Sequence, residues 1–465
     1  KDGSVFFLRT AGLAKSLVIV GQGAAFDLFA GTVSLGGKYQ IKEAPLDHHN
    51  AAALRKIFSW TAPQPFGSEG VSLGLGDRLG LASPGHLDAV AGTEIRPVLA
   101  QQSMRELNLT NRSYADVLDA ATFAVFQEGY KLGFGADGDH LKTGEDIEGA
   151  LALGFSMITL DCSEHINNKI GELSAAEVLA LYRDLPQTLR THLETEYLDK
   201  EHLLCSGRTI SFAPEPFYRM VLVYNQAIDF AAKIYQTCIA PLDRAIDFEI
   251  SIDEVSIPTT PQDHYFVATE LLAKGLKICG IAPRFCGAFE KGIDYRGDLG
   301  QFEEEFAVHA EIAEHYGYKV SVHSGSDKFS IFPIVGKYCP ARLHVKTAGT
   351  NWLEALKVIA EVNPDLFRQL YQVGLENLEG ARKYYVVSLD IGQIPGVSEL
   401  DDDKLEGLLE QPDVRQALHI TYGFMLGDGQ LRVQIYKTLH EHEELYRKKL
   451  STHIGRHIEA LGLKS

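Results

Sequence analysis

Three histidines stand where short apolar runs give way to polar residues. His165 ends the stretch Asp-Cys-Ser-Glu-His, His323 begins His-Ser-Gly-Ser, and His344 lies within Arg-Leu-His-Val-Lys-Thr. Neutral imidazole is a common ligand for divalent transition metals, and carboxylates often complete such sites. We therefore predict that His165, His323 and His344 bind one divalent cation (Zn, Mn, Ni or Co). Two alternatives stay open: some of these histidines only hydrogen-bond within the protein, or Glu249 or Asp253 replaces one of them.

Two glutamates occupy comparable positions and supply a second chemical element. Glu164 precedes His165, and Glu254 follows Asp253 at the end of the apolar run 247–253. Side chains from different strand ends can face one carbon from two sides, which suits an acid and a base that exchange roles. We predict that Glu164 and Glu254 form this pair. A surface ion pair or a helix-start charge would also explain either residue, and strand alternation could turn Asp253 inward instead.

Other polar residues near these positions are candidates to bind a polar substrate. Lys346 has the same strand parity as His344, so a buried ammonium there could neutralise a carboxylate or enolate. A glycine-rich stretch, 135–143, follows the third apolar run and could let the backbone approach a ligand. The predicted substrate-binding residues are Asp137, Lys142, Asp253, Arg284, Ser324 and Lys346. Arg78 is a further candidate to bind an anion, although Arg78 or Arg284 taken singly fits a structural ion pair better.

Such residues need a scaffold that brings strand ends together, and the chain contains a pattern of that kind. Short runs rich in Val, Ile, Leu or Gly alternate with amphipathic stretches, as expected for parallel strands connected by helices. Thr260 before Pro261 is a candidate helix N-cap, and Gly317 is a candidate helix end. We predict an α/β fold, a (β/α)₈ TIM barrel whose functional residues collect at the carboxyl ends of the strands. Eight candidate strands occur, at 71–77, 96–101, 132–137, 156–161, 247–253, 277–283, 318–323 and 342–347.

The remaining segments predict additions to this barrel. The barrel itself is assigned to residues 66–362, with a helical insertion at about 166–244, because that segment is longer than one crossover needs. Residues 1–65 are predicted to form an N-terminal cap, and residues 363–465 a mostly helical C-terminal extension. Within that extension, the run 384–389 is strand-like.

The composition argues against several classes of protein. The 465 residues include 62 acidic and 44 basic side chains, and the net charge of −18 argues against nucleic-acid binding. No apolar run has the length of a membrane span, and no secretory signal is visible. The six cysteines form no CxxC pair, which suits a reducing compartment. We expect a cytoplasmic enzyme that acts on a small molecule, binds neither membrane nor nucleic acid, and could form a homo-oligomer.

Longer motifs in the same regions resemble those of a known family. From about residue 71 onward, the chain resembles the tagaturonate/fructuronate epimerases of bacterial hexuronate catabolism. The motifs are LDCSEHI (160–166), ISIDEV (250–255), TTPQDHYFVA (259–268), APRFCGAFEKGIDYRGDL (282–299), VSVHSGSDKFSIFP (320–333) and RLHVKTAGTNWLEA (342–355). The resemblance implies a barrel, a divalent metal and interconversion of D-tagaturonate with D-fructuronate. It also implies that Glu164 and Glu254 are the acid/base pair and that His165, His323 and His344 bind the metal.

The implied reaction limits the possible chemistry. The two keto acids differ at C4, whereas the ketone lies at C2, so the ketone does not acidify the C4 proton directly. Removal of the C4 hydroxyl proton would instead allow the C3–C4 bond to break and to re-form on the other face of the aldehyde, a retro-aldol and aldol route. Alternatives are a related ketose or keto-uronate epimerase (for example one acting on tagatose), an isomerase, an aldolase, a metal-independent glycoside hydrolase, and a sugar sensor without catalysis.

Overall fold

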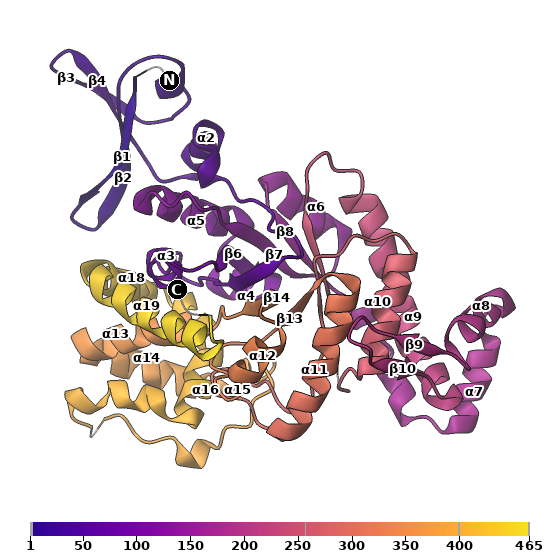
Figure 1. The fold of residues 1–465 in the computed structure, drawn as a ribbon. Coiled ribbons are helices and arrows are strands. Elements are labelled where there is room, and N and C mark those ends of the chain that lie inside the picture. The colour runs from indigo at the N-terminus through magenta and orange to yellow at the C-terminus, as the bar shows by residue number, and fades with distance from the viewer. Residues whose placement is uncertain (1–2, 256, 399, 464–465) are drawn as a thin grey trace.

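The computed structural model describes residues 3–255, 257–398 and 400–463, and its centre is a closed barrel of eight parallel strands (Figure 1). In chain order the strands are β5 (Gly70–Gly74), β6 (Arg96–Ser103), β7 (Gly135–Leu141), β8 (Met157–Asp161), β11 (Asp247–Ser251), β12 (Gly280–Ala282), β13 (Lys319–Val322) and β14 (Arg342–Lys346). Strand β14 closes the barrel by pairing with β5, which places His344 opposite Ser72. The predicted (β/α)₈ barrel is confirmed.

Helices follow the strands around the outside of the barrel. Helix α10 begins as the sequence predicts, because the Thr260 side chain accepts a hydrogen bond from the N–H of Asp263 and Pro261 occupies the first turn. Helix α11 ends at Gly317, whose φ of +79° is a left-handed conformation that glycine adopts without strain. These barrel helices are α3 (Ser83–Val90), α4 (Met104–Thr110), α5 (Tyr114–Glu128), α6 (Gly144–Leu153), α9 (Pro214–Ile234), α10 (Pro261–Ala273), α11 (Leu299–Tyr316), α12 (Phe332–Tyr338) and α13 (Asn351–Val362).

Strand β7 differs from its predicted extent, and the difference changes the site. The third strand was expected to end at Asp137, with a glycine-rich loop after it. Strand β7 instead continues to Leu141, with an irregular pairing between Gly138 and Leu141. Within this irregular part His140 has a φ of +52°, which is uncommon for a residue with a side chain and is found most often at functional sites. The predicted loop is wrong, and Asp139 and His140 lie at the strand's carboxyl end.

The N-terminal residues form a four-stranded antiparallel sheet that projects from one side of the barrel (Figure 1). Its strands are β1 (Val5–Ala11), β2 (Ala14–Val20), β3 (Thr32–Gly36) and β4 (Tyr39–Ala44), and the helices beside it are α1 (Ala24–Asp27) and α2 (His48–Ile57). The segment between β8 and β11 contains α7 (Ala175–Asp184) and α8 (Gln187–Tyr197) before α9. It also contains a hairpin that the sequence did not predict, β9 (Glu201–Leu203) with β10 (Thr209–Ser211).

The C-terminal residues form helices that cover another side of the barrel (Figure 1). They are α14 (Pro364–Glu376), α15 (Leu378–Ala381), α16 (Pro412–Ile420), α17 (Tyr422–Gly427), α18 (Gly429–Glu441) and α19 (Glu443–Ala460), of which α19 packs against α3 and α13. The run 384–389 is not a strand. The outermost positions of the two predicted extensions, 1–2 and 464–465, lie outside the described residues. Among the described helices, none is both long and apolar enough to cross a membrane.

Candidate active site and metal centre

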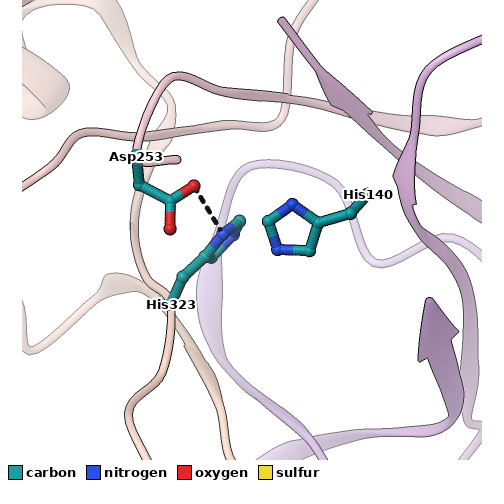
Figure 2. Close-up of side chains that lie close together, drawn as sticks. All are labelled: His140, Asp253 and His323. Carbon is teal, nitrogen blue, oxygen red and sulfur yellow. Dashed lines mark hydrogen bonds and ion pairs between the residues drawn. The ribbon is translucent and has the colours of Figure 1, made fainter. Parts of the chain in front are cut away.

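Three side chains from three different strands converge at the carboxyl end of the barrel. They are His140 on β7, His323 directly after β13, and Asp253 two residues after β11. One possible ligand atom from each lies within 4.8 Å of the other two (Figure 2). His323 Nδ1 is 3.1 Å from Asp253 Oδ1, and the two imidazole rings meet edge to face with their centroids 4.8 Å apart. Two imidazoles and one carboxylate form a donor set that suits a divalent transition metal.

The surroundings of these three residues also suit a cation. His323 Nε2 donates a hydrogen bond to Glu249 Oε1 at 2.8 Å, which fixes the ring so that Nδ1 faces the other two residues. A carboxylate behind the imidazole is the usual support of a metal-binding histidine. His140 Nδ1 and Asp161 Oδ2 are buried and 3.8 Å apart, and neither atom makes a hydrogen bond with the residues that the structure describes. Polar atoms left unpaired in this way are rare in protein interiors.

The same carboxylates shift the pKa values of both imidazoles. Burial lowers the pKa of His140, but the charges of Asp139 and Asp161 outweigh it and raise that pKa to about 10. Burial and Lys346 oppose ionisation of His323, yet its carboxylate partners Asp253 and Glu249 raise its pKa above the usual value. Each imidazole therefore sits in a negative environment that favours a positive charge, whether that charge is a proton or a metal ion.

A buried lysine holds the barrel's acidic groups in place beneath these residues. Lys346 Nζ lies 2.6 Å from Asp139 Oδ1, 3.1 Å from Asp137 Oδ2 and 3.1 Å from Glu249 Oε1. It also donates a hydrogen bond to Thr159 Oγ1 at 2.7 Å. Because a buried charge is costly unless it is paired and hydrogen-bonded, these contacts fix the ends of β7, β11 and β14 relative to one another.

Above this layer lies a cavity of about 540 Å³ at the mouth of the barrel. His140, Asp253 and His323 line it, so a small molecule in the cavity would touch the candidate metal ligands directly. Residues 384–386 of the C-terminal extension and His419 of α16 line its far side. The cavity is of the size that holds one small ligand, and its place at the carboxyl ends of the strands is where barrel enzymes carry their active sites.

Comparison with known proteins decides the family. A family model described as tagaturonate epimerase, UxaE, matches residues 1–461. The chain belongs to the tagaturonate epimerase family. The tagaturonate/fructuronate epimerase of Thermotoga maritima is 41% identical over 464 residues, which cover 99% of this chain and 95% of that protein. Two crystal structures of the fructuronate-tagaturonate epimerase UxaE from Cohnella laeviribosi, one native and one with one glycerol, each match at 48% identity and a TM-score of 0.97, covering 99% of this chain and 94% of theirs.

These findings confirm the family resemblance and the class of enzyme, an epimerase among the isomerases. The placement of the epimerase's individual residues differs in part from the prediction. His323 lies in the converging group, whereas the ring of His165 stacks on Phe230 with centroids 3.9 Å apart. His344 lies inside the barrel, where Nδ1 is 2.9 Å from Ser72 Oγ and burial lowers its pKa to about 3. The structure does not bring His165 or His344 into a group of possible ligands among the described residues.

The two glutamates of the epimerase that were predicted to act as acid and base lie in different environments. Glu254 lines the cavity, where its carboxylate is 3.6 Å from Arg105. Glu164 is outside the cavity lining, with 68% of its side chain exposed, and it pairs with Lys142 at 3.3 Å. The structure therefore brings only Glu254 of this pair to the candidate metal centre.

The residues predicted to bind substrate also separate into two groups. Asp253, Arg284, Ser324 and Lys346 line the cavity of the epimerase. Asp137 is fully buried beneath it, and Lys142 pairs with Asp161 and Glu164 outside it.

The cavity-lining residues that the sequence did not predict include Asp139, His140, Arg105 and Lys291. The pair Asp139-His140 carried a signal, because an acid and a histidine adjoin a strand, but that strand was predicted to end four residues too early.

In the epimerase His140 also forms a group of possible ligands with Asp161 and Glu254, and a separate cluster is Asp327, His453 and His457. Each already has conventional partners: Asp327 accepts from Arg415, His453 Nε2 lies 2.8 Å from Thr350 Oγ1, and His457 Nε2 accepts from the N–H of Asp327 at 3.0 Å. We interpret this cluster as a set of structural contacts that hold α19 against the loop after β13. Ser324 and Ser326 of that loop line the cavity, so these contacts support one wall of the site.

Proposed function

We propose that this epimerase interconverts D-tagaturonate and D-fructuronate and depends on a divalent metal bound by His140, Asp253 and His323. The convergence of these three residues in the cavity is the observation that carries the proposal. The donor set fits Zn, Mn, Ni or Co, because two imidazoles and a single carboxylate leave open coordination positions. A cation bound there would supply Lewis-acid stabilisation of negative charge on the substrate's oxygens.

Five carboxylates line the cavity, and their contacts separate them by role. Asp253 belongs to the candidate metal centre. Glu106 is paired with Arg78 at 2.8 Å, and Glu290 accepts hydrogen bonds from Ser388 and Gln416. Asp139 is paired with Lys346 at 2.6 Å and Glu254 lies 3.6 Å from Arg105, but each adjoins a candidate metal ligand in the sequence, so we assign proton exchange with a substrate to these two.

Asp139 and Glu254 come from different strand ends, β7 and β11, so they can act from two sides of one carbon. Burial raises the pKa of Asp139, but the charges of Lys346 and His140 lower it to about 2, which keeps this carboxylate ionised at neutral pH, so it can accept a hydrogen bond from a substrate hydroxyl. Glu254 lies at the partly exposed edge of the cavity, where it can exchange protons with water. We assign these two residues the acid and base roles, so Asp139 takes the place that the sequence gave to Glu164.

The proposed reaction uses this arrangement in a retro-aldol and aldol sequence. One carboxylate accepts the proton of the C4 hydroxyl, the C3–C4 bond breaks, and its electrons move to the oxygen at C2 while C4 becomes an aldehyde. After the aldehyde turns, C3 adds to its opposite face, and the second carboxyl group, which starts the cycle protonated, donates its proton to the C4 oxygen; exchange with water then resets both groups. The cavity retains the aldehyde fragment between these steps, because its walls limit escape into water.

The proposal is tested with D-tagaturonate that carries deuterium at C4. We expect D-fructuronate that retains the label, because no step removes the hydrogen on C4. Metal removal with a chelator should abolish turnover, and adding back one divalent metal should restore it. Exchange of the C4 label with solvent would contradict the bond-breaking route, and full activity in metal-free enzyme would contradict the metal centre.

A further inference from the structure

The cavity contains a concentration of positive charge that contrasts with the acidic protein around it. The whole chain has a net charge of −18, yet this one cavity is lined by six cationic side chains against five carboxylates. A local excess of one charge inside a concave site indicates that its ligand carries the opposite charge. The six are Arg78, Arg105, Arg284, Lys291, Lys328 and Lys346.

Three of these cations are already satisfied by the protein. Lys346 contacts three carboxylates. Lys328 Nζ donates hydrogen bonds to three backbone carbonyls, at 2.9, 2.6 and 3.0 Å. Arg78 is paired with Glu106 and lies over the ring of Tyr422. Their charges and hydrogen-bond donors are used by protein partners in the walls of the site and are not available to a ligand.

Lys291 and Arg105 are different, because in the described part of the chain Lys291 has no ion pair and Arg105 has only a loose one, 3.6 Å from Glu254. Lys291 Nζ donates one hydrogen bond, to Ser324 Oγ at 2.9 Å, and the ion pairs found among the described residues do not include it. Arg105 donates to the carbonyl of Tyr384 at 3.1 Å and lies over the ring of Tyr385, while its buried Nε has no hydrogen-bond partner among the described residues. Burial lowers the pKa of Lys291, and the charge of Arg105 lowers it further.

Both cations contact residues that directly follow a candidate metal ligand in the sequence. Ser324, which holds Lys291, follows His323 directly, and Glu254, which faces Arg105, follows Asp253 directly. If the substrate placed its C2 oxygen at the metal, its carbons C3 to C6 would extend away from the metal. The carboxylate at C6 could then reach the two cations at the cavity wall.

We infer that Lys291 and Arg105 form a carboxylate-binding subsite that selects sugar acids over neutral ketoses. The inference rests on the proposed function and adds the residues that set its substrate class. A guanidinium binds a carboxylate through two parallel N–H donors, and an ammonium adds a point charge, so together they recognise an anion of this shape. Arg284 is left out of the subsite, because its charge is not among those that act on Lys291, whereas the charge of Arg105 is.

The test compares kcat/KM for D-tagaturonate with kcat/KM for D-tagatose, which has the same six-carbon chain without the carboxylate. A hydrogen bond to a charged group contributes roughly 1.5–3 kcal/mol, so losing it costs about 10- to 100-fold. We expect Lys291→Met and Arg105→Gln each to lower the ratio of the two values by that factor, mainly through KM for the uronate. Arg105→Lys should lower the ratio less than Arg105→Gln, because lysine keeps the positive charge and loses only the pair of parallel N–H donors.

Lys142→Met is the matched control. It removes the same charge from the same face of the barrel, but Lys142 lies outside the cavity lining and pairs with Asp161 and Glu164. We expect its substrate ratio to stay within about threefold of the wild type, allowing for weak surface electrostatics. The thermal unfolding temperature of every variant is compared with that of the wild type, so that a loss of folding is distinguished from a loss of substrate recognition.

Binding of D-gluconate, measured by calorimetry on metal-loaded enzyme, tests the subsite without turnover. We expect this sugar acid to bind the wild type and to bind Lys291→Met at least about tenfold more weakly. An unchanged substrate ratio and unchanged gluconate affinity in both Lys291→Met and Arg105→Gln would overturn the subsite alone. A wild-type enzyme that converts neither uronate would overturn the proposed function, whatever the gluconate result.

Discussion

Replacing His140 distinguishes the metal centre in the structure from the one expected from the sequence. We predict that His140→Asn loses metal affinity and that His165→Asn keeps it. Asparagine suits position 140 because its backbone has a φ of +52°, which asparagine tolerates better than most residues. Its amide oxygen is a poor substitute for imidazole at a transition metal. The exchange therefore removes a ligand and leaves the backbone of β7 in place.

The expected magnitude follows from the number of ligands. His140 supplies one of three candidate donors that lie within 4.8 Å of one another. Changing only a residue that supports a ligand typically lowers metal affinity 10- to 100-fold, so losing a ligand itself should cost at least about 100-fold, or about 2.7 kcal/mol. His165 contacts Phe230 by ring stacking, so His165→Asn should change metal affinity less than about threefold.

The assay titrates chelator-treated enzyme with Mn²⁺ or Zn²⁺ in competition with an indicator of known affinity. Activity at saturating metal is measured in parallel, because a variant that has lost only affinity recovers part of its turnover at high metal concentration. The reasoning would be refuted by a His140→Asn variant that binds metal like the wild type. It would also be refuted if His165→Asn lost affinity to the same extent as His140→Asn.

Three further predictions concern residues around this centre. Glu249→Gln should weaken metal binding about 10- to 100-fold, because the acceptor that orients His323 Nε2 is replaced by a neutral amide; the same competition titration measures it, and unchanged affinity would contradict the role. Asp139→Asn should lower kcat by about 10²- to 10⁴-fold while KM changes little, as steady-state kinetics will show, and a change in KM alone would argue for binding instead. Asp327→Asn should lower the free energy of unfolding by an amount that depends on pH. Burial raises the pKa of Asp327, but neighbouring cationic groups including Arg415 lower it from 3.8 to about 2, so the wild type's advantage is complete above pH 4 and should shrink by about 2 kcal/mol as the pH falls to 2. Urea unfolding of both proteins across that range checks the slope, and a difference independent of pH would contradict it.

Much of the fold could be predicted from the sequence because its signals are local. Each buried parallel strand is a short apolar run, and the ends of α10 and α11 are marked by Thr260, Pro261 and Gly317, whose conformational preferences act within a few residues. The extent of β7 was less predictable. Its glycine and aspartate residues read as a loop, and only pairing with β6 and β8 makes them a strand.

The sequence by itself determined that this chain forms a (β/α)₈ barrel, that it belongs to a family of epimerases, and that His323 and Glu254 stand at strand ends. Those conclusions rest on periodicity, on adjacent residues and on long motifs, which the chain carries before it folds. Only the tertiary structure decided which side chains meet. It joined His140 to His323 and Asp253, turned His165 toward Phe230, and placed His344 one layer deeper in the barrel. The physical reason is that strand twist, irregular pairing and the charge network around Lys346 set side-chain direction through contacts between distant segments, and no local stretch of sequence encodes them.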